Sequence, residues 1–486
     1  MHMSLLNKNF WKELSKKQEF LKEKMVDDFW RLHYHQMPET GWLNDPNGVC
    51  QFKGKYHLYH QYVPDSPISG VGHWAHKTSD DLVHFKEEDI FLSPEHEYEK
   101  DGVYSGSAFV KDDEIHYFYT GNVKKTGDYD YIFDGREQNT VHVVSKNGYT
   151  IDYQEVVIKH EEYPKRYTSH IRDPKVFEHN EKYYMILGTR TIYHTGEILL
   201  YESEDLYKWN YKGTFFGNRS DMGFMWECPD YFELKDQSIL LFSPQGILKK
   251  EHQFQNVYQT GYFIGRTDWE NVVFEPQSSF KELDYGFDFY APQTFEDEQG
   301  RRILWGWMGI GDTKPEYTNP TISRGWQHSL TLPRELTIED GKLKQRPLPE
   351  YQKIRKNKKQ FEIPLTGEYK NKELTCEVTE LLIDLKNING RFDILLRQDT
   401  MIHYENNILE LRHGRSGAGR SVRSIEINDL NQIHLFSDTS SLELFINNGS
   451  YVMSSRIYPE AGENKIKFIG KADIAVQKWD LNKTTE

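Results

Sequence analysis

The sequence predicts an all-β protein: a five-bladed β-propeller followed by a C-terminal β-sandwich, with a short N-terminal helix. Three observations lead to this prediction. A strand-turn-strand unit recurs along the first two thirds of the chain, strand-like alternation fills the last quarter, and the first residues have helical spacing. The changes of pattern divide the chain after residues 29, 340 and 360.

The start of the chain has the pattern of an amphipathic helix. Residues 4–29 place Leu, Phe and Trp among Lys and Glu at helical spacing, and they contain no Pro and no Gly. Such spacing gathers the apolar side chains on one face of a helix. We therefore expect residues 1–29 to form an N-terminal helical segment.

Five segments between residues 30 and 340 follow one plan: a turn, a short strand, a polar turn and a second strand rich in aromatic residues. The segments begin at Asn44, Ser105, Arg172, Glu227 and Tyr290, and four carry a proline at the same place, namely Pro46, Pro174, Pro229 and Pro292. Chance similarity among β-hairpins is the alternative, but it does not readily account for the shared proline. Repeated antiparallel units stack as blades, because neighbouring blades bury sheet faces that none could bury alone. We therefore expect residues 30–340 to form a five-bladed propeller.

A change of composition after residue 340 indicates a second domain. Residues 341–360 are basic and poor in apolar residues, which is typical of a linker. From Phe361 onward, apolar and polar residues alternate as they do in half-buried strands. The Asn448-Gly449 step lies between two such runs and is a strong signal for a β-hairpin. We predict a linker over residues 341–360 and a β-sandwich over residues 361–486.

Composition and charge exclude several classes of function. The chain of 486 residues has a formal net charge of −15, so its overall field should repel nucleic acid. No apolar run is long enough to span a bilayer, and the first residues lack the apolar core of a secretory signal. Cys50, Cys228 and Cys376 are too scattered for a disulfide framework, and no histidine pair has zinc-site spacing. We expect a cytoplasmic protein that needs no metal ion and binds neither nucleic acid nor membrane; the sequence predicts no particular oligomeric state.

Superposing the repeated segments places charged residues at matching positions. Asp45 and Asp173 come directly before the shared proline, and Arg172 and Glu227 stand one position earlier in their segments. The first strand of every propeller blade lines the central channel, so these side chains should converge at one end of it. Glycoside hydrolysis needs such a set, with one carboxylate to attack the anomeric carbon and one carboxylic acid to protonate the leaving oxygen. Each motif alone also has a structural explanation, such as a tight turn for the Asn-Asp-Pro-Asn-Gly string, but their matching positions favour an active site.

At these residues the chain resembles glycoside hydrolase family 32, the invertase and fructan hydrolase family. Three sequence boxes of that family stand in the family's order as Trp42-Leu43-Asn44-Asp45-Pro46-Asn47-Gly48, Arg172-Asp173-Pro174 and Glu227-Cys228. Leu43 stands where the family often has Met, a swap that nearly conserves volume. The resemblance covers most of the chain between residues 30 and 470. It implies a five-bladed β-propeller followed by a β-sandwich, in agreement with the repeats.

The resemblance also implies roles for individual residues. Asp45 would be the nucleophile, Glu227 the general acid and then the general base, and Asp173 the stabiliser of the oxocarbenium-like transition state. The residues implied in substrate binding are Asn44, Gln61, Trp74, Ser105, Arg172, Tyr290 and Trp307. For this chemistry the pKa of Glu227 should be raised, and Arg172 should help to keep the two aspartates ionised. No metal ion or organic cofactor is implied.

The expected partner is a small-molecule sugar, either sucrose-6-phosphate or sucrose. An intracellular hydrolase of short fructans is the first alternative, because it would use the same chemistry. A non-catalytic sugar-binding propeller is a second, although it would tolerate the loss of Asp45 or Glu227 and both are present. An inverting propeller glycosidase acting on arabinose polymers is a third, although it would not need the Asn-Asp-Pro-Asn-Gly and Glu-Cys strings.

A phosphate on the substrate would require local basic side chains, because the chain is acidic overall. The insertions around the third segment supply six candidates: Arg136, Lys165, Arg166, His170, Arg190 and His194. Most of these should be ordinary surface charges. We expect one or two of them at the mouth of the channel, and arginine suits phosphate best because its planar fork binds two oxygens.

Overall fold

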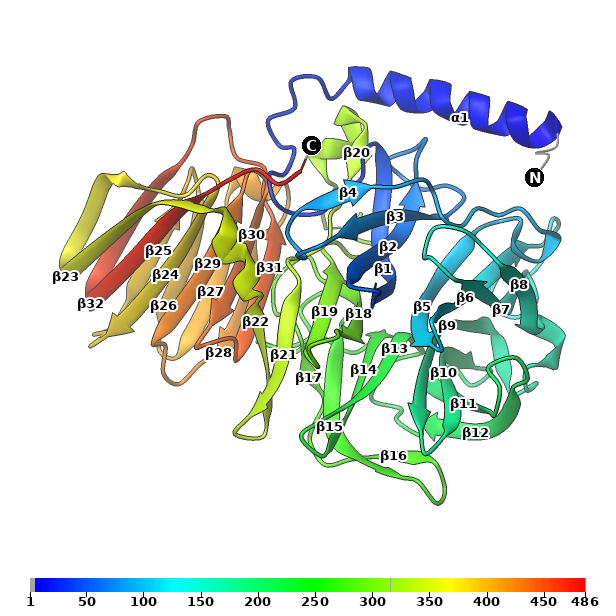
Figure 1. Cartoon of the computed structure of the whole chain (residues 1–486). Helices are drawn as coiled ribbons and strands as arrows, with labels where there is room; N and C mark the ends of the chain where they lie inside the picture. Colours follow the sequence, from blue (N-terminus) through cyan, green and yellow to red (C-terminus); the bar gives the residue numbers. More distant parts are fainter. Residues whose placement is uncertain (1–4, 315, 486) are drawn as a thin grey trace.

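The computed structural model describes residues 5–314 and 316–485. Figure 1 shows small sheets arranged around a common axis and, beside them, a body formed by one larger sheet. The five small sheets are the blades of a propeller, and a ten-stranded sheet forms the second body. The all-β fold class predicted from the repeats is therefore confirmed.

Each blade is built mainly from consecutive antiparallel strands, and the first strands of the five blades contact one another around the channel. The first blade holds β1 Gly41–Phe52, β2 Lys55–Val63, β3 His73–Ser79 and β4 Phe85–Glu87, with β20 Trp326–Gln327 added in parallel to β1. The second and third blades hold β5 Val103–Lys111, β6 Glu114–Lys124, β7 Arg136–Ser145, β8 Tyr153–Ile158, β9 Tyr167–His179, β10 Lys182–Thr191, β11 Gly196–Ser203 and β12 Asn210–Phe216. The fourth and fifth hold β13 Met225–Leu234, β14 Gln237–Gln245, β15 Gly261–Asp268, β16 Val273–Pro276, β17 Lys281–Glu282, β18 Tyr290–Glu296, β19 Arg302–Trp307, β21 Arg334–Glu339 and β22 Lys342–Pro347.

The second body is one sheet folded into two packed layers. Its strands are β23 Arg355–Thr375, β24 Thr379–Lys386, β25 Phe392–Leu396, β26 Thr400–Glu405, β27 Ile408–His413, β28 Val422–Glu426, β29 Gln432–Asp438, β30 Ser441–Ile446, β31 Tyr451–Arg456 and β32 Lys465–Leu481. Ile394, Leu411, Leu444 and Ile474 come from different parts of this sheet and share one buried cluster. The two layers therefore enclose an apolar core, as a sandwich does.

The N-terminal helix is shorter than the predicted segment. Helix α1 spans Leu5–Glu23 and lies along one edge of the propeller (Figure 1), where Leu14 and Leu21 are buried and Lys17 forms an ion pair with Asp65 at 2.8 Å. Residues 24–29 form turns instead of continuing the helix. No helix in the described part of the chain is both long and apolar enough to cross a membrane.

The segment expected to be a linker is largely built into the two bodies. Within residues 341–360, β22 pairs with β21 and completes the fifth blade, the 3₁₀ turn η4 Pro349–Ile354 follows, and β23 begins at Arg355. Tyr351 and Ile354 are buried. The few apolar residues of this basic stretch therefore anchor it, which its composition did not indicate. The remaining 3₁₀ turns are η1 Glu97–Glu99, η2 His160–Glu162, η3 Pro320–Arg324 and η5 Arg415–Gly417.

A buried network of charges joins the propeller to the sandwich. Arg334 of the fifth blade donates to Glu443 Oε2 at 2.7 Å and to Asp284 Oδ2 at 3.1 Å. His35 lies between Asp438 Oδ2 at 2.9 Å and Glu443 Oε1 at 3.0 Å. Burial alone would lower the pKa of His35, but the two carboxylates outweigh it and raise the pKa. Buried charges are tolerated only when paired, so this network fixes how the two bodies meet.

Candidate active site

A cavity of about 330 Å³ opens at one end of the propeller channel, and every first strand of a blade contributes to it. These strands bring Asp45 from β1, Ser105 from β5, Asp173 from β9, Glu227 from β13 and Tyr290 from β18 to the same place. The repeats predicted this convergence. Residues at matching positions in the repeats thus converge on one cavity, because the propeller symmetry places the same part of each blade beside the channel.

A β-bulge in each first strand aims these side chains into the cavity. In β9, Arg172 pairs with Gly188 and Lys175 pairs with Ile186, so two residues of β9 lie opposite one residue of β10. The register of the other four inner strands shifts by one residue in the same way. Asp173 and Cys228 adopt left-handed backbone at φ 64° and 48°, a conformation that costs a non-glycine residue roughly 1–2 kcal/mol. Bulges commonly re-aim a side chain beside an active site.

Asp45 is buried and held by hydrogen bonds at the base of the cavity. Its carboxylate accepts from Ser105 Oγ at 2.6 Å and from Asn44 Nδ2 at 3.1 Å, and the Cys228 thiol lies 3.8 Å away. Burial raises the pKa of Asp45 to about 6, and the charge of Glu227 adds to this rise. The carboxyl group is therefore mostly ionised at neutral pH and titrates just below it.

Glu227 is surrounded by hydrogen-bond donors. Its Oε1 accepts from Arg172 Nε at 3.1 Å and Nη2 at 2.5 Å. Its Oε2 accepts from Gln245 Nε2 at 2.7 Å and from the Tyr290 hydroxyl at 2.6 Å. Both oxygens are thus fixed in position in the unliganded site.

Asp173 is buried beside the other two carboxyl groups. It accepts from the Cys228 backbone N–H at 2.9 Å, and Arg172 Nε lies 4.0 Å from its Oδ2. Burial raises the pKa of Asp173 to about 7, although the Arg172 charge opposes this. The predicted effect of Arg172 is present at Asp173, whose pKa its charge lowers, but burial outweighs it, and the guanidinium donates its hydrogen bonds to Glu227.

Six of the seven residues predicted to bind substrate line the cavity: Asn44, Gln61, Ser105, Arg172, Tyr290 and Trp307. Gln61 Nε2 and Trp307 Nε1 are buried without a hydrogen-bond partner among the described residues, so both donors are available to sugar hydroxyls. Trp74 is the exception. Its side chain is fully buried, and its indole N–H donates to the Tyr104 carbonyl at 3.0 Å, so it supports the cavity wall without reaching the cavity.

Several cavity residues were not among those predicted: Trp42, Tyr104, Gln245, Tyr258 and Asp312. Trp42 stands inside the Trp42–Gly48 box, and Gln245 ends the second strand of the fourth repeat, so both carried a signal in the sequence. Tyr258 and Asp312 come from irregular connections, and the Tyr258 hydroxyl donates to Asp312 Oδ2 at 2.6 Å. No motif pointed to that pair.

Of the six basic residues proposed for a phosphate, Arg136 lines the cavity. Its guanidinium lies 3.9 Å over the Tyr131 ring, and its buried Nε has no hydrogen-bond partner among the described residues. Burial, together with the Arg172 charge, lowers the pKa of Arg136 to about 10. An anion bound here would offset both the desolvation of the guanidinium and its repulsion by Arg172.

The other five basic residues are engaged elsewhere, exposed or uncharged. Arg166 pairs with Glu197 at 2.7 Å, Arg190 donates to His194, and Lys165 is exposed. His170 lies 3.0 Å from Arg172 Nη1, and burial with the neighbouring arginines lowers its pKa to about 2. His170 is therefore neutral at physiological pH.

Comparison with known proteins identifies relatives over the whole length. Residues 35–347 match the model of the Glycosyl hydrolases family 32 N-terminal domain, and residues 350–482 match the model of the family 32 C-terminal domain. The chain is 40% identical to a sucrose-6-phosphate hydrolase of Bacillus subtilis, with 99% of each chain covered, and 38% identical to one of Staphylococcus xylosus, with 96% of each covered.

Solved structures agree with these matches. The structure of sucrose-6-phosphate hydrolase from Lactobacillus gasseri superposes with a TM-score of 0.88 at 29% identity, and the alignment covers 97% of each chain. The β-fructofuranosidase of Bombyx mori superposes with a TM-score of 0.85 at 30% identity, covering 99% of this chain and 100% of the other.

Proposed function

Because the chain belongs to glycosyl hydrolases family 32 and so hydrolyses β-fructofuranosides with retention, we propose that Asp45, Glu227 and Asp173 carry out this reaction. The observation that carries this proposal is the convergence of the three carboxyl groups in one cavity. A retaining mechanism needs one carboxylate as nucleophile and one carboxyl group as acid and base.

In the first step, Asp45 attacks the anomeric carbon of the fructosyl unit. The bond from that carbon to the leaving oxygen breaks, and Glu227 gives its proton to that oxygen. A covalent fructosyl ester on Asp45 results, and the rest of the substrate leaves with a hydroxyl group in place of the broken bond. In the second step, Glu227 takes a proton from water, the water oxygen bonds to the anomeric carbon, and Asp45 leaves as a carboxylate.

The hydrogen bonds of the site suit this exchange of a proton. The Tyr290 hydroxyl donates to Glu227 when the carboxyl group is ionised and can accept from it when the group is protonated, because a phenol does both. Ser105 and Asn44 hold the Asp45 carboxylate in one orientation for attack. Asp173 lies close enough to bind fructosyl hydroxyls and to stabilise positive charge on the sugar ring.

We further propose that the leaving half of the substrate carries a phosphate and that the substrate is sucrose-6-phosphate. The relatives named above support this choice, and so does Arg136, a buried arginine with an unpartnered N–H on the cavity wall. With a net charge of −15, the chain attracts no anion at long range, so a phosphate must be held by such a local donor. A charged sugar does not cross a bilayer unaided, which favours a cytoplasmic location.

The test is a side-by-side measurement of kcat/KM on sucrose-6-phosphate, sucrose, raffinose and a short fructan. We expect the phosphorylated sugar to be the preferred substrate. Equal values for sucrose-6-phosphate and sucrose would reject the phosphate, and a preference for the fructan would make the chain a fructan hydrolase with the same chemistry.

A further inference from the structure

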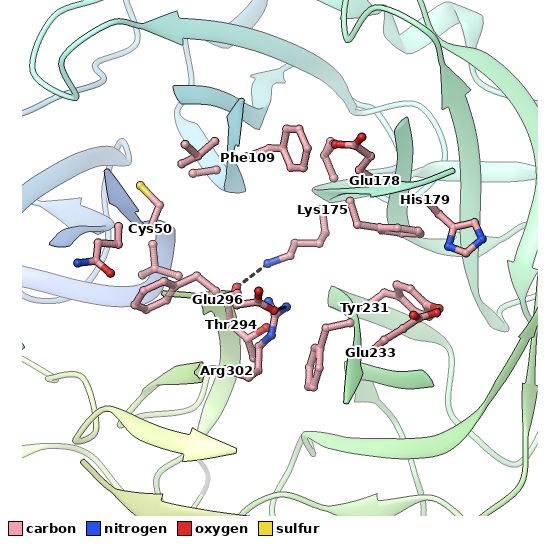
Figure 2. A pocket seen from close by; sticks show the side chains of 18 of the residues that line it. Cys50, Phe109, Lys175, Glu178, His179, Tyr231, Glu233, Thr294, Glu296 and Arg302 are labelled. Carbon is pink, nitrogen blue, oxygen red and sulfur yellow. Dashed lines mark hydrogen bonds and ion pairs between the residues drawn. The ribbon is translucent and has the colours of Figure 1, made fainter. Parts of the chain in front are cut away.

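A second cavity, of about 490 Å³, occupies the opposite end of the propeller channel (Figure 2). The same five inner strands line both cavities, but the second uses residues further along each strand. On β9, Asp173 faces the catalytic cavity, whereas Lys175 faces the second one. The second cavity is therefore a separate space, entered from the other face of the propeller.

A polar layer separates the two cavities. Figure 2 shows Lys175 extending across the channel, and its Nζ donates to the Thr294 carbonyl at 2.6 Å. Lys175 Nζ also lies 3.3 Å from Asp230 Oδ1, while Asp230 Oδ2 accepts from the Thr294 N–H at 2.7 Å. Lys175 and Thr294 line the second cavity, and Asp230 is buried against them.

Most charges at the second cavity are paired within the protein. Arg302 pairs with Glu296 at 3.1 Å, and Lys111 pairs with Glu178 at 3.0 Å. Glu233 accepts a hydrogen bond from the Tyr231 hydroxyl at 3.1 Å. Glu233 is thus the one of these carboxylates without an ion pair among the described residues, which disfavours an anion, while the paired ions still offer donors and acceptors to a neutral polar ligand.

Two buried donors in the cavity have no hydrogen-bond partner among the described residues. They are Arg302 Nε and Thr294 Oγ1, and Thr294 is only 1% exposed. A buried donor without a partner costs about 1–3 kcal/mol, so a ligand or water is expected at this position. Both groups lie on the paired strands β18 and β19 and line the same space.

Aromatic rings form much of the remaining wall. Phe109, Phe177 and Trp269 line the cavity, and Trp269 lies flat against His179, with ring centroids 3.4 Å apart. Rings of this kind pack against the C–H faces of sugars, while carboxylates and N–H donors bind the hydroxyls. We propose that this cavity is a second carbohydrate-binding site, which takes a neutral mono- or disaccharide and lies outside the catalytic cavity.

Calorimetric titration with two sugars tests the proposal. Sucrose is used with the Asp45→Asn variant, so that it is not consumed, and maltose, which contains no fructosyl unit, is used with the unmodified chain. We expect two classes of site for sucrose and one for maltose. Replacing Thr294 by Val keeps the shape but removes the unpartnered hydroxyl, and it should weaken the second site by about tenfold.

The controls separate this site from the catalytic one. Thr321→Val changes an equally buried threonine outside the cavity and should leave both classes of site intact. A crystal of the Asp45→Asn chain with sucrose should show sugar against Thr294 and Trp269. A single class of site for sucrose, no binding of maltose, maltose affinity that does not respond to Thr294→Val, or inorganic phosphate in the cavity in place of sugar would each overturn the proposal. The maltose result does not depend on whether Asp45 is the nucleophile, because maltose binding is measured on the unmodified chain.

Discussion

Arg172 donates two hydrogen bonds to a single oxygen of Glu227, from Nε at 3.1 Å and from Nη2 at 2.5 Å. Gln245 and Tyr290 donate to the other oxygen, so the carboxyl group is held at both ends. A group fixed in this way is well placed to give a proton to a leaving oxygen in one defined position. Arg172 thus holds the proposed acid by hydrogen bonds, while its charge also favours the ionised form of Asp173.

Glu227→Ala should therefore damage only the reactions that need a proton donor. Sucrose has a poor leaving group, so we expect its first step to slow by about 10²–10⁴-fold. An aryl fructoside has a good leaving group and should form the fructosyl ester at a nearly normal rate. Pre-steady-state kinetics on both substrates measure this difference, and equal losses would show that Glu227 is not the acid.

Asp45→Asn should abolish turnover while leaving sugar binding intact. The amide has nearly the shape of the carboxylate but cannot form the covalent intermediate, so kcat should fall by several orders of magnitude. Steady-state assays and sucrose titration together check both halves of this expectation. A variant that keeps more than about a tenth of the kcat would contradict the role of nucleophile.

The kcat/KM of the unmodified chain should fall on the acid side of pH 6. The pKa of Asp45 is raised to about 6 and the group must be ionised to attack, so each pH unit below 6 should cost about tenfold. The pKa of the neighbouring Asp173 is raised to about 7, so the two groups titrate as a pair. The apparent pKa of the acid limb, where kcat/KM falls with decreasing pH, should therefore lie between about 6 and about 7. A rate profile between pH 4.5 and 8 tests this, and a limb near pH 4 would mean that the aspartates are ionised far more easily than their burial implies.

Arg334→Met should destabilise the contact between propeller and sandwich. The change leaves Asp284 buried without its cation and Glu443 with His35 alone, and breaking a buried ion pair in this way typically costs about 3–5 kcal/mol of unfolding free energy. Urea unfolding measures the loss. The matched control is Arg266→Met, whose ion pair with Glu275 is exposed and should change stability by less than about 1 kcal/mol. Similar losses in the two variants would show that the buried network contributes no special stability.

The sequence predicted the architecture and the convergence of carboxyl groups because both are periodic. Asp45, Asp173 and Glu227 occupy matching places in repeats, and propeller symmetry turns matching places into one cavity. Trp74 was misplaced because a motif position does not reveal which way a side chain points, and its ring packs into the blade. Tyr258 and Asp312 were missed because irregular connections have no period from which to predict a contact. The raised pKa values of the aspartates also depend on burial, which only the packed structure reveals.

Arg136 should determine the preference for a phosphorylated substrate. Its buried Nε has no partner, the Tyr131 ring fixes its plane, and it lines the cavity that holds Glu227. Arg136→Ala should lower kcat/KM for sucrose-6-phosphate by about ten- to a hundredfold, which corresponds to about 1.5–3 kcal/mol for one charge-assisted contact. Plain sucrose should be almost unaffected, since it carries no group for the guanidinium to bind.

Two further variants show whether the effect belongs to the arginine fork or to charge in general. Arg136→Lys keeps the charge but loses the planar pair of donors, so it should recover only part of the activity on the phosphorylated sugar. Arg166→Ala removes another arginine, which pairs with Glu197 outside the cavity, so it should not separate the two substrates. A mutation that only damaged the fold would lower both activities together, so the ratio of the two kcat/KM values is the informative quantity. If that ratio is the same in the unmodified chain, Arg136→Ala and Arg166→Ala, no phosphate is bound at Arg136.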